Sequence, residues 1–217
     1  MDIQKAEEQI FNKWSERYPE DSIVKDGIVN IEDYLVSDRK VLLILKEAND
    51  EGGGGWDLRK FIRDGARSQT WNTVTRWLTG IRDIEKDFHW EEIKKINKAD
   101  RKRLLSSIAV MNLKKVPGGG SSNKDEIKET AERNRDLINK QFEIYKPDVT
   151  ICCGTGTIVK DVMNVCLDID WQKTERAITY GAYNDNKHIF RFYHPQARYP
   201  GHFKYYMLLD AIKSVVK

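Results

Sequence analysis

The chain has 217 residues, enough for one sizeable domain that buries a core without disulfides or metal ions. Its 37 basic and 34 acidic side chains leave a formal net charge of only +3, so composition alone does not indicate a polyanionic partner, although a local basic face can lie within such a total. The charged N-terminal segment lacks the apolar region of a signal peptide, and no stretch approaches the length of a membrane span. We therefore expect a cytoplasmic protein without a membrane partner.

Apolar runs and helical periodicities alternate along the chain. The spacing of apolar residues predicts an amphipathic helix at residues 2–17, and short continuous apolar runs predict strands buried on both faces at residues 41–45, 106–113 and 147–154. A hairpin is expected around the turn at residues 184–187. The remaining helices are expected at residues 56–84, with a break near Gly65, and at residues 89–105, 124–146, 155–169 and 202–216.

This alternation predicts the α/β class, with a mostly parallel sheet covered by helices on both faces of a single domain. Cys152 and Cys153 follow each other in a predicted strand, so their side chains point to opposite faces. None of the three cysteines, the third being Cys166, belongs to a C-x-x-C pair. We therefore expect buried free thiols in a reducing compartment, with no metal site and no cofactor.

Four loops follow the predicted strands, and in open α/β sheets ligands bind beyond the carboxyl ends of the strands. These loops are "KEANDEGGGGW", "NLKKVPGGGSSN", "GTGT" and "HPQAR". Each carries glycine, which lets a backbone approach a ligand closely, or a polar side chain. Strand-end chemistry at all four positions predicts a ligand site at this edge of the sheet.

The polar residues of these loops have both functional and structural interpretations. Glu47 suits a carboxylate that orients or deprotonates water, or one that caps a helix or pairs with a lysine. Trp56 suits stacking on a planar ligand, or anchoring the next helix in the core. Asn112 suits reading the edge of a nucleobase, or an amide satisfied by backbone. His194, held by the following proline, suits stabilising a developing oxyanion, or a structural role.

The backbone amides of "GTGT" could hold a phosphate where the next helix begins. The basic side chains near the loops could follow a nucleic-acid backbone or belong to an ordinary solvated surface; they are Lys46, Lys114, Lys115 and Arg198.

In order along the chain, four segments resemble motifs of the uracil-DNA glycosylase superfamily, most closely its iron–sulfur-containing class. "KEAND" is similar to G-E-A-P-G at Glu47 and Ala48, and "MNLKKVPGGG" is similar to T-N-x-x-K-C-x-P-P at Asn112 and Lys115. "FEIYKPDVTICCG" resembles a segment ending in P-x-v-i-x-x-L-G, and "FYHPQ" resembles T-Y-H-P-A. The likeness runs from about residue 39 to the C-terminus.

The resemblance implies a three-layer α/β/α sandwich around a central, mostly parallel four-stranded sheet. Relative to the family pattern, the single domain of residues 1–217 has a helical N-terminal extension at about residues 1–38 and a helical insertion at about residues 66–105. The insertion carries Trp71, Trp77 and Trp90, and we expect it to reshape or cover the pocket.

The activity implied is hydrolysis of the N-glycosidic bond of a damaged base such as uracil, in single- or double-stranded DNA, after the base leaves the stack. By the resemblance, Glu47 positions or activates water, Trp56 stacks on the base, Asn112 reads its edge and His194 stabilises charge on it. The further residues implied for substrate binding are Ala48, Asn49, Gly154 and Thr155. Those implied for DNA binding are Lys115, Gln196, Arg198 and Tyr199, with residues 196–199 as a wedge.

The sequence also departs from the family motifs. Lys46, Asn49 and Asp50 replace the first glycine, the proline and the last glycine of G-E-A-P-G. The cluster cysteines have no counterparts, and Val116 and Asn134 stand near two of their positions, so we expect no cluster. The alternatives are therefore a catalytically inactive module of the same fold that binds nucleic acid or a nucleotide, and a hydrolase acting on a small nucleotide. In each case we expect a monomer.

Overall fold

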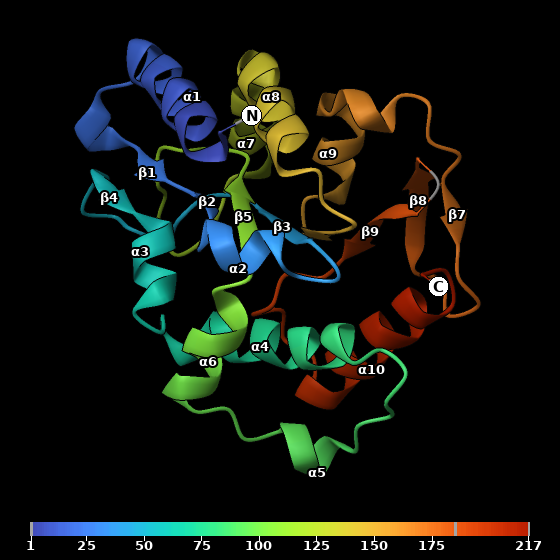
Figure 1. The fold of residues 1–217 in the computed structure, drawn as a ribbon. Helices are drawn as coiled ribbons and strands as arrows, with labels where there is room; N and C mark the ends of the chain where they lie inside the picture. The colour runs from blue at the N-terminus through green and yellow to red at the C-terminus, as the bar shows by residue number, and fades with distance from the viewer. Residues whose placement is uncertain (1, 185, 217) are drawn as a thin grey trace.

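The computed structural model describes residues 2–184 and 186–216, and within these ranges the chain folds around a seven-stranded sheet (Figure 1). The strand order across the sheet is β2-β5-β3-β6-β9-β8-β7. In that order the strands are Gly27–Ile28, Ile108–Asn112, Val41–Leu45, Val149–Cys153, Lys187–Phe192, Thr179–Tyr183 and Gln172–Lys173.

The sheet is mixed. The central strands β5, β3, β6 and β9 are parallel to one another. On one side β2 pairs antiparallel with β5, and on the other side β8 and β7 continue the sheet antiparallel from β9. The expectation of a four-stranded sheet is therefore wrong, while the α/β class and the three predicted buried strands are confirmed. The extra strands come from the hairpin and from two-residue segments, which are too short to leave a periodic signal in the sequence.

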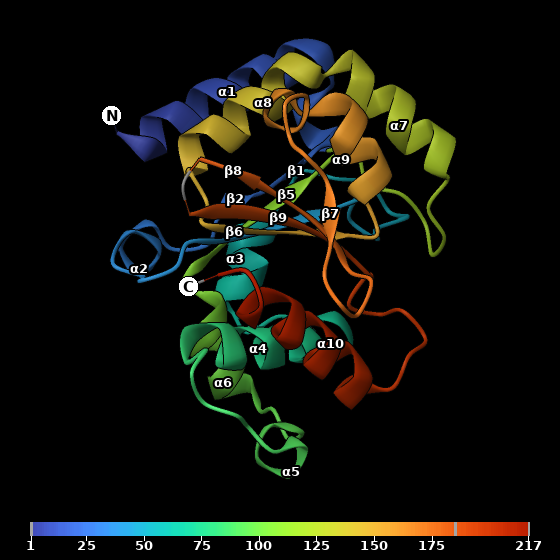
Figure 2. The ribbon, with the colours of Figure 1, turned by 90° about the vertical axis from the view of Figure 1, so that its right-hand side faces the viewer.

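Helices lie on both faces of the sheet (Figure 2). One face carries α1 (Ile3–Arg17), α7 (Lys124–Arg133), α8 (Arg135–Tyr145) and α9 (Gly156–Val162). The other carries α3 (Leu58–Arg63), α4 (Ser68–Arg82), α6 (Lys98–Leu105) and α10 (Gly201–Lys213). The shorter elements are η1 (Glu20–Ser22), α2 (Ile31–Leu35), α5 (Trp90–Ile93), η2 (Asn164–Cys166) and a separate parallel pair, β1 (Val24–Lys25) with β4 (Trp56–Asp57).

The alternation of side chains along β3 explains why both faces are apolar. Val41, Leu43 and Leu45 belong to one core cluster, and Leu42 and Ile44 belong to the other. Successive residues of a strand point to opposite faces, so a strand covered on both sides needs an unbroken apolar run. Each such side chain stabilises the fold by roughly 1.5–3 kcal/mol through its burial.

Each predicted helical region contains helix, but the helix expected at residues 89–105 is interrupted at residues 94–97 and the one expected at residues 155–169 ends at Val162. Residues 56–57, expected to begin a helix, form β4. The break near Gly65 is present, because Gly65 has a φ of +100°, which favours glycine. The helix expected at residues 124–146 is divided at Asn134 into α7 and α8. Residues 66–105 contain α4, α5 and α6 joined by non-helical segments, whereas residues 2–38 also contribute β1 and β2 and so take part in the sheets. In the part of the chain that the structure describes, no helix is long and apolar enough to cross a bilayer.

Candidate functional site

A pocket of about 410 Å³ lies at the carboxyl ends of β3, β5 and β9. Its walls come from the loop after β3, the beginnings of α3 and α4, the last residue of β5 and the loop after β9. The residues that line it are Leu45, Glu47, Ala48, Asn49, Asp50, Trp56, Leu58, Phe61, Arg67, Gln69, Thr70, Trp71, Asn112, His194 and Gln196.

The pocket brings together most of the residues singled out from the sequence. Seven of the predicted site residues line it: Glu47, Ala48, Asn49, Trp56, Asn112, His194 and Gln196. The other five, which are Lys115, Gly154, Thr155, Arg198 and Tyr199, lie outside its lining. The rule that ligands bind beyond the carboxyl ends of parallel strands therefore located the pocket correctly.

Backbone pairing beyond the ends of β3 and β5 holds the first loop in place. The amide of Lys114 donates to the carbonyl of Lys46, and the amide of Gly118 donates to the carbonyl of Ala48, both at 2.9 Å. The amide of Asp50 then donates to the carbonyl of Gly118. The two loops thus continue the parallel ladder as far as the pocket and give residues 47–49 a defined geometry.

Asn112 is the most buried of the polar residues that line the pocket. Its side chain is almost completely buried, and within residues 2–184 and 186–216 neither its amide nitrogen nor its amide oxygen has a hydrogen-bond partner. Buried polar atoms are nearly always paired, because burying them without a partner costs about 1–3 kcal/mol. An amide that is buried, unpartnered and at a pocket wall is prepared to donate to and accept from a ligand edge.

A buried ion pair fixes the backbone of Asn112. The Asp26 carboxylate accepts a hydrogen bond from the backbone amide of Asn112 at 2.7 Å, and the Lys115 ammonium donates one to the backbone carbonyl of Asn112 at 2.9 Å. Lys115 also donates to both carboxylate oxygens of Asp26 at 2.8 Å, and neither side chain of this pair is exposed. The prediction that Lys115 contacts DNA is therefore wrong, because its charge is used inside the fold to hold the end of β5.

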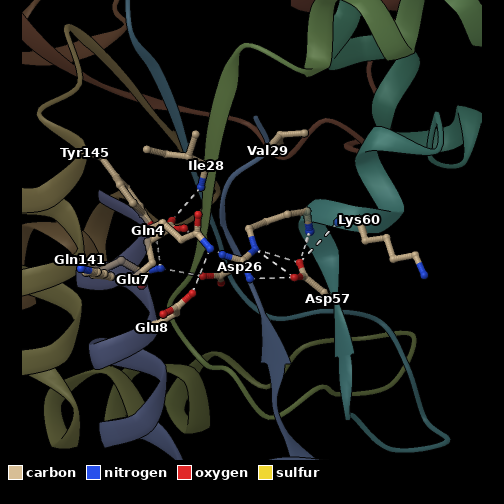
Figure 3. Close-up of polar contacts among 12 residues, drawn as sticks. Gln4, Glu7, Glu8, Asp26, Ile28, Val29, Asp57, Lys60, Gln141 and Tyr145 are labelled. Atoms are coloured by element: carbon tan, nitrogen blue, oxygen red, sulfur yellow. Dashed lines mark hydrogen bonds and ion pairs between the residues drawn. The ribbon is translucent and has the colours of Figure 1, made fainter. Parts of the chain in front are cut away.

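The same polar cluster extends to α1 and α8 (Figure 3). Gln141 donates to Asp26 and also to the Tyr145 hydroxyl, while Glu7 accepts from the backbone of Ile28. Burial lowers the pKa of Lys115, against the attraction of Asp26, and raises the pKa of Glu7. The N-terminal segment thus contributes directly to the support of the pocket.

His194 is held in one orientation and in its neutral form. Its Nδ1 accepts a hydrogen bond from the backbone amide of Gln196 at 3.2 Å, which leaves Nε2 as the protonated nitrogen of the neutral ring. Burial, reinforced by the charges of Lys46 and Lys204, lowers the pKa of His194 to about 4. Lys204 also donates to the carbonyls of Pro195 and Ala197 and so fixes the loop.

Glu47 pairs with a lysine, as one of the two interpretations has it, and its action on water stays a prediction. It lines the pocket, and its buried carboxylate accepts from the Lys114 ammonium at 2.6 Å. Lys114 also pairs with Glu126, and these two partners raise the pKa of Lys114 although burial opposes them. Gly118 lies directly against Glu47, since a Cβ there would come within 2.5 Å of the carboxyl carbon. The carboxylate is therefore fixed from two sides.

Trp56 is oriented by an acidic partner. Its indole nitrogen donates to the Asp50 carboxylate at 2.8 Å, and its ring contacts Phe61 edge to face. Asp50 therefore has a definite role in orienting Trp56. Trp56 packs against the core cluster, as one interpretation has it, and it also lines the pocket, where stacking on a ligand stays a prediction.

The start of α4 closes one side of the pocket, and of the three tryptophans in residues 66–105 only Trp71 lines it. Arg67, Gln69, Thr70 and Trp71 come from the start of α4, and Gln196 donates to the Thr70 hydroxyl at 2.6 Å. Sequence reasoning did not single out Arg67, Gln69 or Thr70. The sequence feature that could have indicated these three residues is the break at Gly65, because the next helix, α4, begins soon after it and its first turn lines the pocket.

The "GTGT" segment does not supply the predicted substrate contacts of Thr155. The Thr155 hydroxyl is buried and donates to the carbonyl of Ile44 at 2.9 Å, so it links β3 to the start of α9. Gly154 has a φ of +72°, and a Cβ there would lie 3.7 Å from the Cβ of His194. Gly154 thus lies beside the His194 loop rather than in the pocket lining.

The cysteines do not fit an iron–sulfur cluster. Cys152 belongs to one core cluster and Cys153 to the other, and both are buried and free, as is Cys166. Among the residues that the structure describes, no group of three or more His, Cys, Asp or Glu side chains is arranged to hold a metal ion.

No protein-family model matches the sequence, and no curated protein matches it either.

Proposed function

We propose that this protein recognises one nucleobase in the pocket and hydrolyses its N-glycosidic bond to DNA, as a glycosylase-like enzyme with a uracil-DNA glycosylase-like three-layer α/β/α fold. The observation that carries the proposal is Asn112, whose buried amide has neither donor nor acceptor satisfied among the described residues. A base edge offers one acceptor and one donor side by side, which matches a carboxamide. Trp56 on the pocket wall adds an aromatic surface for the base plane.

The chemistry assigned to the site follows from the orientation of its two functional side chains. As the C1′–N bond breaks, its electron pair moves to the base, and Nε2–H of neutral His194 donates to the oxygen that gains negative charge. A water molecule forms the new bond to C1′, and its proton passes to the Glu47 carboxylate or to solvent. Neutral His194 is consistent with the lowered pKa, because its charge is not needed to donate one hydrogen bond.

The test is a single-turnover assay on labelled oligonucleotides that contain uracil, hypoxanthine, xanthine or a thymine mismatch. Wild type should release one of these bases. His194→Ala should slow release by about 10²- to 10³-fold, the usual effect of removing one donor to an oxyanion. His89→Ala is the matched control, since His89 is exposed at the start of α5 and outside the pocket lining. Equal rates for His194→Ala and wild type would refute the assignment.

One observation favours the alternative of a binding module without catalysis. The Glu47 carboxylate is paired with Lys114, which competes with any water for its oxygens. Lys114→Met distinguishes a catalytic site from a binding site, because it removes the ion-pair partner of Glu47 and keeps the carboxylate itself. Wild type that binds but does not cleave, with Lys114→Met equally inactive, would identify a binding module.

We also propose a monomer, and a cytoplasmic location that is supported by the three buried free cysteines, which are typical of a reducing compartment. Light scattering on the purified protein measures the oligomeric state directly.

A further inference from the structure

Three large aromatic side chains are exposed together next to the pocket. Tyr193, Tyr199 and Phe203 are 38%, 45% and 39% exposed. The ring centroids of Tyr193 and Tyr199 are 4.7 Å apart, and those of Tyr199 and Phe203 are 5.8 Å apart. Single exposed apolar residues are ordinary, whereas a contiguous group marks a surface that binds something.

These rings are supported from the core. Trp77 contacts Phe192 edge to face, and Phe192 contacts Tyr193 in the same way, at 5.6 Å and 5.3 Å between centroids. The loop that carries Tyr199 is held by Lys204, whose ammonium donates to the carbonyls of Pro195 and Ala197. The exposed faces are therefore already ordered, so a ligand that stacks on them has little side-chain freedom to remove.

The surroundings of the rings favour an anionic partner. The segment that carries the rings, residues 193–203, includes no aspartate or glutamate but includes Arg198. Arg198 is exposed and directly precedes Tyr199, and Arg67 is exposed at the pocket wall. Although the total charge of the chain is nearly neutral, these two exposed arginines give the surface near the rings and the pocket a local positive charge.

We propose that Tyr193, Tyr199 and Phe203 form a stacking platform for the unpaired bases that flank the target, so that the substrate of the site is single-stranded DNA. This inference rests on the proposed function for the identity of the polymer. The platform shares its loop with His194 and Gln196, which line the pocket, so a strand lying on the rings has its next nucleotide at the pocket entrance. Arg198 and Arg67 then face the phosphates of the same strand.

The arrangement of the rings distinguishes this platform from a wedge that enters a duplex. A wedge is an apolar side chain that projects between two base steps. Tyr199 instead packs against a ring on each side and forms part of a broad surface. In a duplex both faces of each base are already stacked, so such a surface is useful only for bases that are unpaired.

The experiment measures binding of undamaged oligonucleotides by fluorescence anisotropy, so that no cleavage is required. Three ligands are compared at one salt concentration: a single strand, the duplex of the same sequence, and a strand of equal length made entirely of abasic sites. The variants are Tyr199→Ala and Tyr199→Phe. Leu167→Ala is the matched control, since Leu167 is an exposed apolar residue on another part of the chain.

Wild type should bind the single strand more tightly than the duplex. Tyr199→Ala should weaken binding of the single strand by roughly 5- to 150-fold, the loss expected for one stacked base. Tyr199→Phe and Leu167→Ala should bind as wild type does, and the abasic strand should bind equally to all four proteins. The stacking proposal would be refuted by tighter binding of the duplex than of the single strand, or by no binding of any ligand. It would also be refuted if Tyr199→Ala weakened binding of the abasic strand as much as binding of the normal single strand. Because these ligands hold no damaged base, failure of cleavage would leave the result unchanged and would count only against the proposed function.

Discussion

The buried pair of Asp26 and Lys115 makes the sharpest prediction about stability. Neither side chain is exposed, and the ammonium donates to both carboxylate oxygens, to the Asn112 carbonyl and to Gln141. Asp26→Ala leaves this ammonium in the core without a counter-charge. Breaking a buried pair from one side costs about 3–5 kcal/mol, which is a large part of the roughly 5–15 kcal/mol that stabilises a typical domain.

The reciprocal change gives a second estimate of the same interaction. Lys115→Met leaves the Asp26 carboxylate with only the hydrogen bonds from Asn112 and Gln141, so we again expect a loss of about 3–5 kcal/mol. The double variant leaves no lone charge. Its cost should therefore fall below the sum of the two single costs by about 3 kcal/mol.

Urea unfolding followed by circular dichroism measures the free energy of unfolding of all four proteins. Lys128→Met is the control, because Lys128 forms half-exposed ion pairs with Glu132 and Asp161 and should change the free energy by less than about 1 kcal/mol. A loss of less than about 1 kcal/mol in Lys115→Met, or additive costs in the double variant, would refute the reasoning. If Lys115 contacted a phosphate instead, Lys115→Met would stay folded and bind DNA more weakly. The slope of the logarithm of its binding constant against the logarithm of the salt concentration would then be smaller by about one.

Three further outcomes concern the pocket itself. Asn112→Ala should remove base recognition while leaving the free energy of unfolding unchanged or raised by about 1 kcal/mol, because it deletes an unsatisfied buried amide; a strongly destabilised variant in urea unfolding would contradict this. Gly118→Ala should destabilise by about 1–3 kcal/mol and slow cleavage, because its Cβ would displace the Glu47 carboxyl carbon 2.5 Å away; wild-type rates and stability would contradict the contact. The lowered pKa of His194 contributes stability that is fully present above pH 6.5 and is lost as the pH falls toward 4, by about 3 kcal/mol in total, since only the unfolded chain binds the proton in that range. His194→Gln should lose less stability than wild type between these pH values, and equal losses would argue against a buried neutral ring.

Local patterns were sufficient for the strands at the centre of the sheet. The runs at residues 41–45, 108–112 and 149–153 are buried at every position and apolar at all but Asn112 and Thr150, because helices cover both faces of these strands. The two-residue strands β2 and β7 have no such pattern. They exist because β5 and β8 offer backbone partners, which is a property of the folded sheet and not of those residues.

The sequence by itself determined the α/β class, the position of the pocket at the strand ends, and most of its polar residues, since parallel strands bring their following loops to one edge. Only the tertiary structure decided the role of each side chain. Lys115 looks like a surface lysine in the sequence, yet it lies in the core because Asp26, 89 positions earlier, compensates its charge there. The Thr155 hydroxyl likewise donates to the carbonyl of Ile44 and does not reach the pocket. The unpartnered side-chain amide of Asn112 and the neutral ring of His194 result from burial by several elements at once. Charge and hydrogen-bonding state depend on neighbours that are distant in the chain, and local periodicity carries no information about them.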